Sequence, residues 1–536
     1  MSLPKSEERH SMLGYQHVNY AKVIKGNDVC EDIENNNKDD AFDKNDAKQY
    51  SSNAKGVFAQ FMVSGAILLL AAGGGMPIGY SAVLLPQLAE DNGTMHADQE
   101  LGSWIASVHS LATPVGSLLS GPLLDAIGRR SSLQLSSVPL CAGWIVMGFS
   151  NNITWLLIGR LVLGFAVGLM SVPAQVLLGE MADPRLRGFL TGGSLTFYCL
   201  GILLVYALGA SFTWDVVAFC GTVLPVLGLI ALTMIPESPV WLVRRKKHGK
   251  ARKALLWLRG GNMEQVNVEL AALEARAKTD SARKVKNLSW LEQVSSAIST
   301  IVDPSILKPL TIINVFNILQ LVSGTYIVVF YAVDIVNDIG GDTINSYLAA
   351  VCTAVIRTVF SFIASLLLLK LGRRCLGMLS AFGSAAASLV IAGYMIFKNE
   401  SSSLDVYVVG ICLLIYVGAN TMGLMILPPL MIAELLPQRA RGIGGGFTFF
   451  LFNLLIFFVT KVFPVVNDIV GITGIFTIFG VGALLEAIFI YVAVPETKKS
   501  TLEEIEDYFQ VNTLIVYSVC QLNIINILMT ILHKIS

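Results

Sequence analysis

Residues 125–130 read Asp-Ala-Ile-Gly-Arg-Arg, and residues 369–374 read Leu-Lys-Leu-Gly-Arg-Arg. Two further motifs recur in the same order, Glu-x4-Arg-x-Arg-Gly (180–188 and 434–442) and Pro-Glu-Ser or Pro-Glu-Thr (236–238 and 495–497). Because three motifs repeat in one order, with their internal spacing kept, the sequence indicates an internal duplication. The two halves are predicted to share one fold.

The stretches between these motifs are apolar. Of 536 residues 54% are hydrophobic and 14% are charged, against about 25% charged in a soluble domain. Twelve segments are each long enough to cross a hydrocarbon layer of about 30 Å. They lie at 58–84, 104–124, 132–150, 155–178, 189–210, 214–235, 309–333, 347–370, 375–397, 406–432, 443–463 and 471–494.

The sequence therefore predicts an all-α membrane protein with twelve transmembrane helices in two six-helix bundles. The expected parts are a disordered cytosolic N-terminal tail (1–55), a first bundle (56–235), a cytosolic linker with short helices (236–308), a second bundle (309–497) and a C-terminal tail (498–536). In that tail Leu514 to Leu532 is apolar, and a thirteenth span, an interfacial helix and an alternative terminus all remain open.

The distribution of Lys and Arg predicts the orientation. With residues 1–55 inside, the connections 86–103, 151–154, 211–213 and 334–346 lie outside and contain neither residue. This asymmetry places both ends of the twelve-span core in the cytosol. Sequons at Asn92, Asn152 and Asn399 then lie on the outer side, where glycosylation is expected.

Two halves with the same orientation are parallel repeats, for which a site between the halves near mid-membrane is expected. One Gly-Arg-Arg alone is explained as a positive anchor at a helix end. Repeated beside Glu-x4-Arg-x-Arg-Gly, it predicts a cytosolic charge network that acts as a gate latch. The predicted members are Asp125, Arg129, Arg130, Glu180, Arg185, Arg187, Arg373, Arg374, Glu434, Arg439 and Arg441.

Several classes of function are excluded by the composition. The formal net charge is zero, so no basic surplus points to nucleic acid. The six histidines and eight cysteines show no ligand spacing and no disulfide framework. No nucleophile with a base and no phosphate-cradling loop is found. We expect neither a metal nor a cofactor, and no enzyme activity.

Taken together, the motifs resemble the sugar porter family of the major facilitator superfamily, from about residue 58 to 509. The matching stretches are 121–130, 159–164, 180–188, 236–241, 320–331, 434–441 and 495–504. The Thr-Lys-x-Phe-Pro ending at 460–464 is similar to insect trehalose-transporter relatives. The resemblance implies two bundles that alternate access to a sugar or polyol. The expected partners are a small sugar and the lipid bilayer of the plasma membrane.

The resemblance also implies a binding stretch in the seventh span. A sugar site needs amide, hydroxyl and aromatic side chains rather than charges. Helix contact or core packing is the alternative role for each of these residues. The candidate substrate-binding residues are Asn317, Gln320, Ser323, Tyr326, Tyr331, Asn420, Thr421 and Asn453.

The chain departs from the family pattern at five expected sugar contacts, which weakens the case for glucose. Leu195 and Leu321 stand where the family has Gln, and Tyr326 stands where it has Asn. Pro429 and Phe452 stand at positions of a Trp and an Asn. A sugar sensor built on the same frame is therefore an alternative to a carrier.

The coupling mechanism is predicted from a missing acid. Proton-linked relatives pair a first-span Asp with the fourth-span Arg, but here Ser81 stands in place of the Asp while Arg160 remains. We expect a uniporter, with a proton-coupled symporter as the alternative. Arg357 is a second intramembrane charge and by default a functional candidate. A carbonyl, Glu486 and the substrate are its possible partners.

Overall fold

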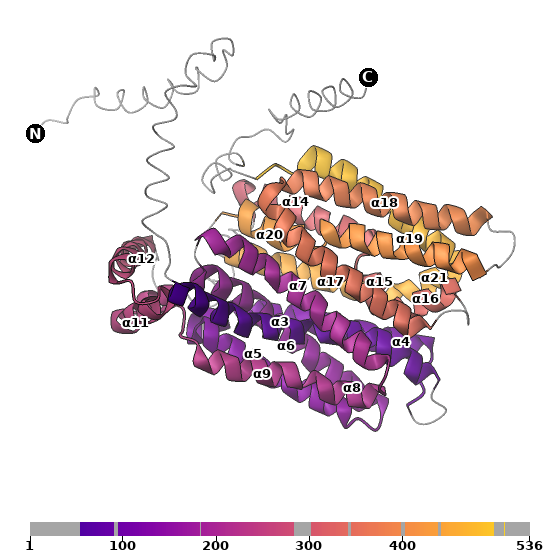
Figure 1. Cartoon of the computed structure of the whole chain (residues 1–536), viewed down its shortest axis with the longest axis horizontal. Coiled ribbons are helices and arrows are strands. Elements are labelled where there is room, and N and C mark those ends of the chain that lie inside the picture. The colour runs from indigo at the N-terminus through magenta and orange to yellow at the C-terminus, as the bar shows by residue number, and fades with distance from the viewer. Residues whose placement is uncertain are drawn as a thin grey trace, which may run out of the picture.

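The computed structural model describes residues 54–90, 95–182, 184–283, 302–340, 345–397, 403–437, 441–497 and 509. In the first half, successive spans run nearly antiparallel to one another (Figure 1). These helices are α3 (Ala54–Ala89), α4 (Gln99–Ile127), α5 (Arg129–Gly148), α6 (Ile153–Met181), α7 (Pro184–Gly209), α8 (Trp214–Gly221) and α9 (Val223–Met234). Since α8 and α9 form one interrupted helix, the first half has six long helices, four of which are apolar enough to cross a membrane.

Three linker helices follow, and they lie at one end of the molecule (Figure 1). They are α10 (Pro239–Arg244), α11 (His248–Leu258) and α12 (Met263–Arg283). Arg129 and Arg373, which begin helices of the two halves, lie at this same end, which we call the basic end. The short linker helices expected from the sequence are present.

The second half also has six spans. Its helices are α14 (Pro304–Val322), α15 (Ile327–Phe330), α16 (Ala332–Gly340), α17 (Ser346–Lys370), α18 (Arg373–Phe397), α19 (Ser403–Met422), α20 (Leu427–Leu435) and α21 (Arg441–Ala493). The long α21 is two spans joined at Gly471, whose φ of 67° breaks the helix. Helices α14 to α16 make one span, and α19 with α20 makes another.

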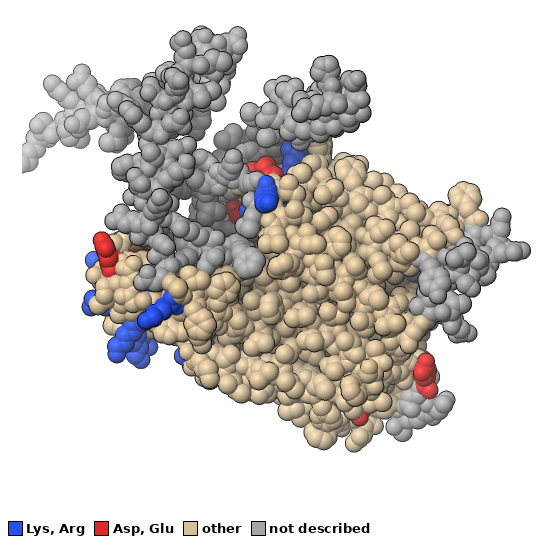
Figure 2. Space-filling view, viewed as in Figure 1, with Lys and Arg blue, Asp and Glu red and all other residues tan. Residues whose placement is uncertain are grey.

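Within the described ranges, eight helices are long and apolar enough to cross a membrane on length and composition alone. Helix α5 falls below that measure because it is rich in serine. Its Ser132 and Ser137 hydroxyls donate to backbone carbonyls four residues earlier, at 2.6 and 2.9 Å. Hydroxyls satisfied in this way remain compatible with a membrane interior. Figure 2 shows the corresponding surface, in which charged side chains lie at the ends and an uncharged band lies between them.

Two spans of the second half are broken near their middle. Between α14 and α15, Gly324 has a φ of 83°, and the ring of Phe479 occupies the place where a Cβ would lie, at 2.6 Å. Between α19 and α20 the helix unwinds at 423–426 and restarts at Leu427. Pro429 stands where the family pattern has a Trp. It lies in the first turn of α20, where a proline removes no hydrogen bond within the helix.

The two halves are joined by hydrogen bonds at the end opposite the basic end. Gln99 Nε2 on α4 donates to Asp468 Oδ2 on α21 at 2.8 Å, and Lys461 Nζ donates to Ser103 Oγ at 2.7 Å. The Tyr206 hydroxyl on α7 donates to the carbonyl of Val329 at 2.6 Å. These bonds hold the two halves together at that end.

Candidate transport site and charge clusters

An amide-rich cluster lies where the seventh span meets the break in the tenth. Gln320 on α14 is 1% exposed, and its Nε2 donates to the carbonyl of Leu424 at 2.8 Å. The same unwound turn is held from the other side by Ser380 on α18, whose hydroxyl accepts the Leu424 N–H at 3.0 Å. Gln320 thus holds the carbonyl of Leu424 within the turn at 423–426, where the regular helix of the tenth span is interrupted.

Several amide atoms in this cluster have no protein partner among the described residues. They are Gln320 Oε1, Asn317 Oδ1 and both polar atoms of Asn420. All three side chains are at most 3% exposed. Buried amides are normally hydrogen-bonded, so several unpaired atoms close together indicate a place for a polar ligand. Three acceptors and one donor match a neutral molecule with hydroxyl groups, which both donate and accept.

Three other predicted contacts are engaged within their own spans. The Ser323 and Thr421 hydroxyls donate to the carbonyls of Gln320 and Val417 at 2.8 and 2.7 Å. Asn453 Nδ2 donates to the carbonyl of Phe449 at 2.8 Å. Their carbonyl or hydroxyl oxygens retain acceptor capacity. A role in binding stays a prediction for each.

The two predicted aromatic contacts lie against α21. The ring of Tyr326 meets Phe452 edge to face at 5.3 Å between centroids. The Tyr331 hydroxyl donates to the carbonyl of Thr460 at 3.0 Å, and its ring lies 4.8 Å from that of Phe463. Both tyrosines are therefore positioned by the eleventh span.

The altered family positions are apolar contacts in this structure. Leu195 on α7 packs against the core cluster of the second half, and Leu321 is 3% exposed within the core. At these positions, polar contacts of the family are replaced by apolar packing.

Arg160 is fully buried and has only neutral partners. Its Nη1 donates to the carbonyl of Pro77 at 2.6 Å and its Nε to the carbonyl of Ile105 at 3.0 Å. Its Nη2 donates to the Ser81 hydroxyl. Within the described part of the chain, Arg160 makes no ion pair. Ser81 stands at the position of the missing acid. It therefore offers Arg160 a neutral hydroxyl instead of a carboxylate.

Arg357 bridges the two broken spans. Its Nη1 lies 3.4 Å from the carbonyl of Thr325, in the seventh-span break, and 3.5 Å from Sδ of Met425, in the tenth-span break. Of the alternatives left open by the sequence, the carbonyl is the partner found. Glu486 is fully buried, and neither of its carboxyl oxygens has a hydrogen-bond partner among the residues described.

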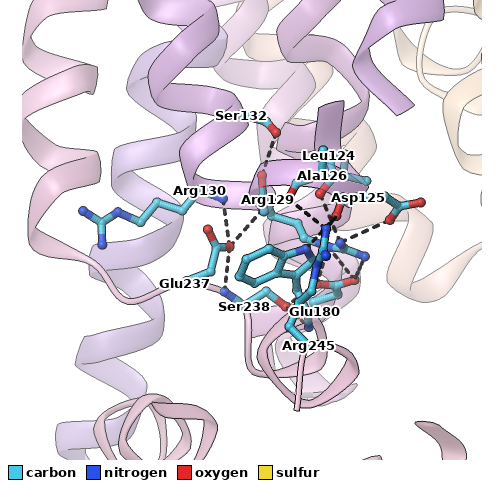
Figure 3. A network of polar contacts seen from close by, with 12 residues as sticks. Leu124, Asp125, Ala126, Arg129, Arg130, Ser132, Glu180, Glu237, Ser238 and Arg245 are labelled. Atoms are coloured by element: carbon cyan, nitrogen blue, oxygen red, sulfur yellow. Dashed lines mark hydrogen bonds and ion pairs between the residues drawn. The ribbon is translucent and has the colours of Figure 1, made fainter. Parts of the chain in front are cut away.

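The charge cluster of the first half connects α5, α6 and the start of α10 (Figure 3). Arg129, with a side chain 4% exposed, places Nε 3.1 Å from Glu180 Oε2. The Ser238 hydroxyl donates to the same carboxylate. Glu237 accepts the backbone N–H groups of Arg129 and Arg130 at 2.9 and 3.0 Å, so it neutralises the first turn of α5.

The second half repeats this arrangement bond for bond. Arg373 Nη2 lies 2.8 Å from Glu434 Oε1, and the Thr497 hydroxyl donates to Glu434. Glu496 accepts the N–H groups of Arg373 and Arg374 at 3.0 and 3.1 Å. We call each arrangement a clip. The sequence analysis missed the roles of Glu237 and Glu496, although the repeated Pro-Glu-Ser/Thr motif was the available signal.

The remaining predicted charges surround the clips. Asp125 has a side chain 76% exposed and lies 3.5 Å from Arg129. Arg130 Nη2 donates to the carbonyl of Thr233 at 3.3 Å, and the Arg374 guanidinium lies 4.9 Å from the ring of Tyr491. Outside the described residues and side chains lie Arg185, Arg187, Arg439 and Arg441. The ion pairs found for the clips each stay within one half.

Of the three sequons, the structure describes one. Asn152 is exposed and caps α6, with its side chain accepting the N–H of Trp155 at 3.0 Å. Asn92 and Asn399 lie outside the described residues.

Two six-span halves around a buried amide cluster define a membrane protein with the major facilitator fold. The chain belongs to the family described as sugar (and other) transporters, whose model matches residues 41–509. It is 31% identical over 458 residues to a facilitated trehalose transporter of Culex quinquefasciatus, covering 84% of this chain and 86% of that one. It is also 31% identical over 469 residues to a homologue of such a transporter in Drosophila simulans, covering 85% and 93%.

Some relatives are much longer. The trehalose transporter of Drosophila grimshawi is 32% identical over 437 residues, which make up 81% of this chain but 46% of that one. The chain thus spans about half the length of that relative.

Solved structures share the fold. The proton:xylose symporter XylE bound to 6-bromo-6-deoxy-D-glucose matches with a TM-score of 0.67 at 22% identity, over 83% of this chain and 99% of that one. An inward-open form of the Escherichia coli xylose transporter matches with a TM-score of 0.66 at 21% identity, over 84% and 99%. The fold class predicted from the sequence is confirmed.

Proposed function

We propose that this chain is a facilitative carrier of a sugar, trehalose or a hexose, which works by alternating access without covalent chemistry. The observation that carries the proposal is the group of unpaired amide atoms on Asn317, Gln320 and Asn420. The group lies where two broken spans meet, which Arg357 bridges, and its own side chains are uncharged. The relatives named as trehalose transporters support the choice of sugar.

We further propose uniport rather than proton symport. The neutral partners of Arg160 support this, because no carboxylate pairs with this cation in the described part of the chain. His109, which is 1% exposed, and Glu486 are buried ionisable groups without hydrogen-bond partners in the described residues. In a symporter one of these groups would have to carry the proton.

The proposed orientation has the basic end in the cytosol and the chain in the plasma membrane. The basic residues of α10 and α11 support it. Residues 56–235 and 309–497 would then act as the two rocking units, with the clips and Arg185, Arg187, Arg439 and Arg441 at the inner gate. Asn92, Asn152 and Asn399 would be open to glycosylation on the outside.

Radiotracer uptake in cells that express this chain tests the function, with trehalose, glucose, fructose and a polyol as the panel. The proposal expects saturable uptake of trehalose or a hexose that exceeds uptake by cells carrying the empty vector. The sensor alternative is favoured by the apolar replacements at Leu195 and Leu321. Saturable binding of a sugar to the purified protein, without uptake of any sugar in the panel, would support the sensor and contradict the carrier.

A further inference from the structure

A recess of about 670 Å³ lies at the basic end, away from the transport site and next to the first clip, with which it shares Glu237. Its walls come from the ends of α4 and α9, the start of α5, and the linker helices α10 and α11. The chemistry of the recess is set by four cations and two indoles, namely Arg130, Lys247, Lys250, Lys253, Trp241 and Trp257. This recess is separate from the amide cluster between the halves.

Within the described residues, the four cations of the recess face one carboxylate in its lining, so the recess keeps an excess of positive charge. The one acid in its lining is Glu237, which is taken up by backbone N–H groups of α5. Lys247, Lys250 and Lys253 form no ion pair in the described ranges, and Nε of Arg130 is buried without a hydrogen-bond partner. Cations held together in a hollow, with a donor left unpaired, favour an anionic ligand.

The apolar wall of the recess shows which kind of anion fits. Ile127 and Met234 line the recess and are 38% and 67% exposed. Met234 is also the last of a row of exposed apolar residues along α9 at helical spacing, namely Val223, Val226, Leu227, Ile230 and Met234. The recess therefore opens onto a face suited to hydrocarbon. Trp257, 37% exposed, is of the type enriched where membrane meets water.

We propose that this recess binds the phosphate-bearing headgroup of an anionic phospholipid, whose acyl chains lie along the exposed face of α9. Lysines at the rim would contact the phosphate and the second acidic group of the headgroup, and the indoles would cover its glycerol. The linker helices are tied to the first clip, because Trp241 Nε1 and Arg245 Nη2 both donate to the carbonyl of Asp125, at 3.1 and 2.8 Å. A bound lipid would thereby hold the linker against the clip.

Native mass spectrometry of the purified full-length chain in detergent tests this, with phosphatidylserine and phosphatidylcholine as probes. We expect the chain to retain phosphatidylserine preferentially. The combined variant Lys247→Gln, Lys250→Gln and Lys253→Gln should bind it roughly a hundredfold more weakly, since each cation near an anionic lipid contributes about fivefold. The matching Lys→Arg variant, which keeps the charges, should bind like the unaltered chain.

The matched control removes three exposed cations from the same linker but outside the recess: Lys246→Gln, Arg252→Gln and Lys278→Gln. Its affinity for phosphatidylserine should stay within about threefold of the unaltered chain, because these side chains do not line the recess. An equal loss in both triple variants would contradict the proposal, as would equal retention of the two lipids. Competition by glycerophosphoserine as strong as by the intact lipid would show a site for a soluble anion instead. None of these outcomes depends on which sugar is carried.

Discussion

Gln320 donates through Nε2 to the carbonyl of Leu424 in the tenth-span turn, and its Oε1 is left unpaired among the described residues. Gln320→Leu keeps the approximate volume but removes both functions. We expect the kcat/KM for uptake to fall at least about tenfold, because a ligand hydroxyl loses its partner and the Leu424 carbonyl loses its donor. Concentration-dependent radiotracer uptake, normalised to surface expression, measures the effect.

The control is Gln134→Leu, a half-buried glutamine of α5 outside the amide cluster. Its uptake should stay within about twofold of the unaltered chain, as for substitutions away from a binding site. If Gln320→Leu transported as well as this control, the amide cluster would not be the substrate site.

Ser81 is the side-chain hydroxyl partner of Arg160. We expect uptake by the unaltered chain to change by less than about twofold between about pH 5.5 and 7.5. Ser81→Asp places a carboxylate beside the guanidinium, where ionisation is favoured and an ion pair forms. Uptake by this variant should therefore stay slow between about pH 5.5 and 7.5 and rise only at lower pH, where the carboxylate takes up a proton.

Ser81→Ala serves as the control, since it removes the hydroxyl without adding a group that titrates. Its uptake should be as independent of pH as that of the unaltered chain. A steep pH dependence of the unaltered chain itself would instead show that another buried group, such as His109 or Glu486, takes part in transport.

At the scale of elements, the first turn of α5 is capped by the carboxylate of Glu237, which follows the sixth span in the chain. Glu237→Ala leaves the N–H groups of Arg129 and Arg130 without their acceptor. We expect this to cost about 2 kcal/mol of stability, in the upper range for loss of a helix cap. Thermal unfolding in detergent, followed by tryptophan fluorescence, measures the change. Glu90→Ala, at an exposed glutamate outside the clips, is the control and should leave the midpoint almost unchanged.

Because the clip is duplicated, Glu496→Ala should destabilise the protein to a similar extent through the start of α18. If neither variant lowered the midpoint, the clips would not stabilise the helix ends. Gly128 belongs to the same arrangement, since a Cβ there would approach Glu237 Oε2 at 2.5 Å and its φ is 105°.

Helices α4 and α21 meet across the two halves at the end opposite the basic end. Gln99→Cys combined with Asp468→Cys, joined by a short bis-methanethiosulfonate, should reduce uptake to background, because the two ends could no longer separate. A reducing agent should restore uptake. Since Cys352 and Cys375 are exposed, each single variant treated with the same reagent is the control. Full uptake by the cross-linked double variant would exclude opening at this end.

The sequence predicts an element well when neighbouring residues determine it, and poorly when residues far apart in the chain determine it. The spans follow from apolar runs, which need no knowledge of neighbours, and the charged ends follow from repeated motifs. The break at Gly324 was not predicted, because it depends on the ring of Phe479 more than a hundred residues away. Likewise Pro77, Ile105 and Ser81 meet around Arg160 only after three spans have packed together.

The candidate site shows the same limit. The sequence selected Asn317, Gln320 and Asn420 by motif and by polarity, and the structure leaves atoms of all three unpaired. It could not distinguish them from Ser323, Thr421 or Asn453, because hydrogen bonds within a helix are invisible in a residue pattern.

At the scale of the whole molecule, each half is closed by its own clip, while the hydrogen bonds across the halves lie at the opposite end. Each half can therefore keep its internal bonds while it rocks against the other. The amide side chains of Asn317, Gln320 and Asn420 are uncharged, while a buried carboxylate, that of Glu486, lies beside Ser323. This arrangement is compatible with the proposed uniport, in which the sugar gradient alone drives transport.

Transport in proteoliposomes that contain only this chain tests that claim most directly. Vesicles loaded with unlabelled trehalose or hexose should take up the labelled sugar by exchange, and a protonophore at constant voltage should leave the rate unchanged. Without internal sugar, uptake should stop when the inner and outer concentrations are equal, with or without an imposed pH gradient. Accumulation above the outer concentration that requires the pH gradient and collapses with the protonophore would contradict the account.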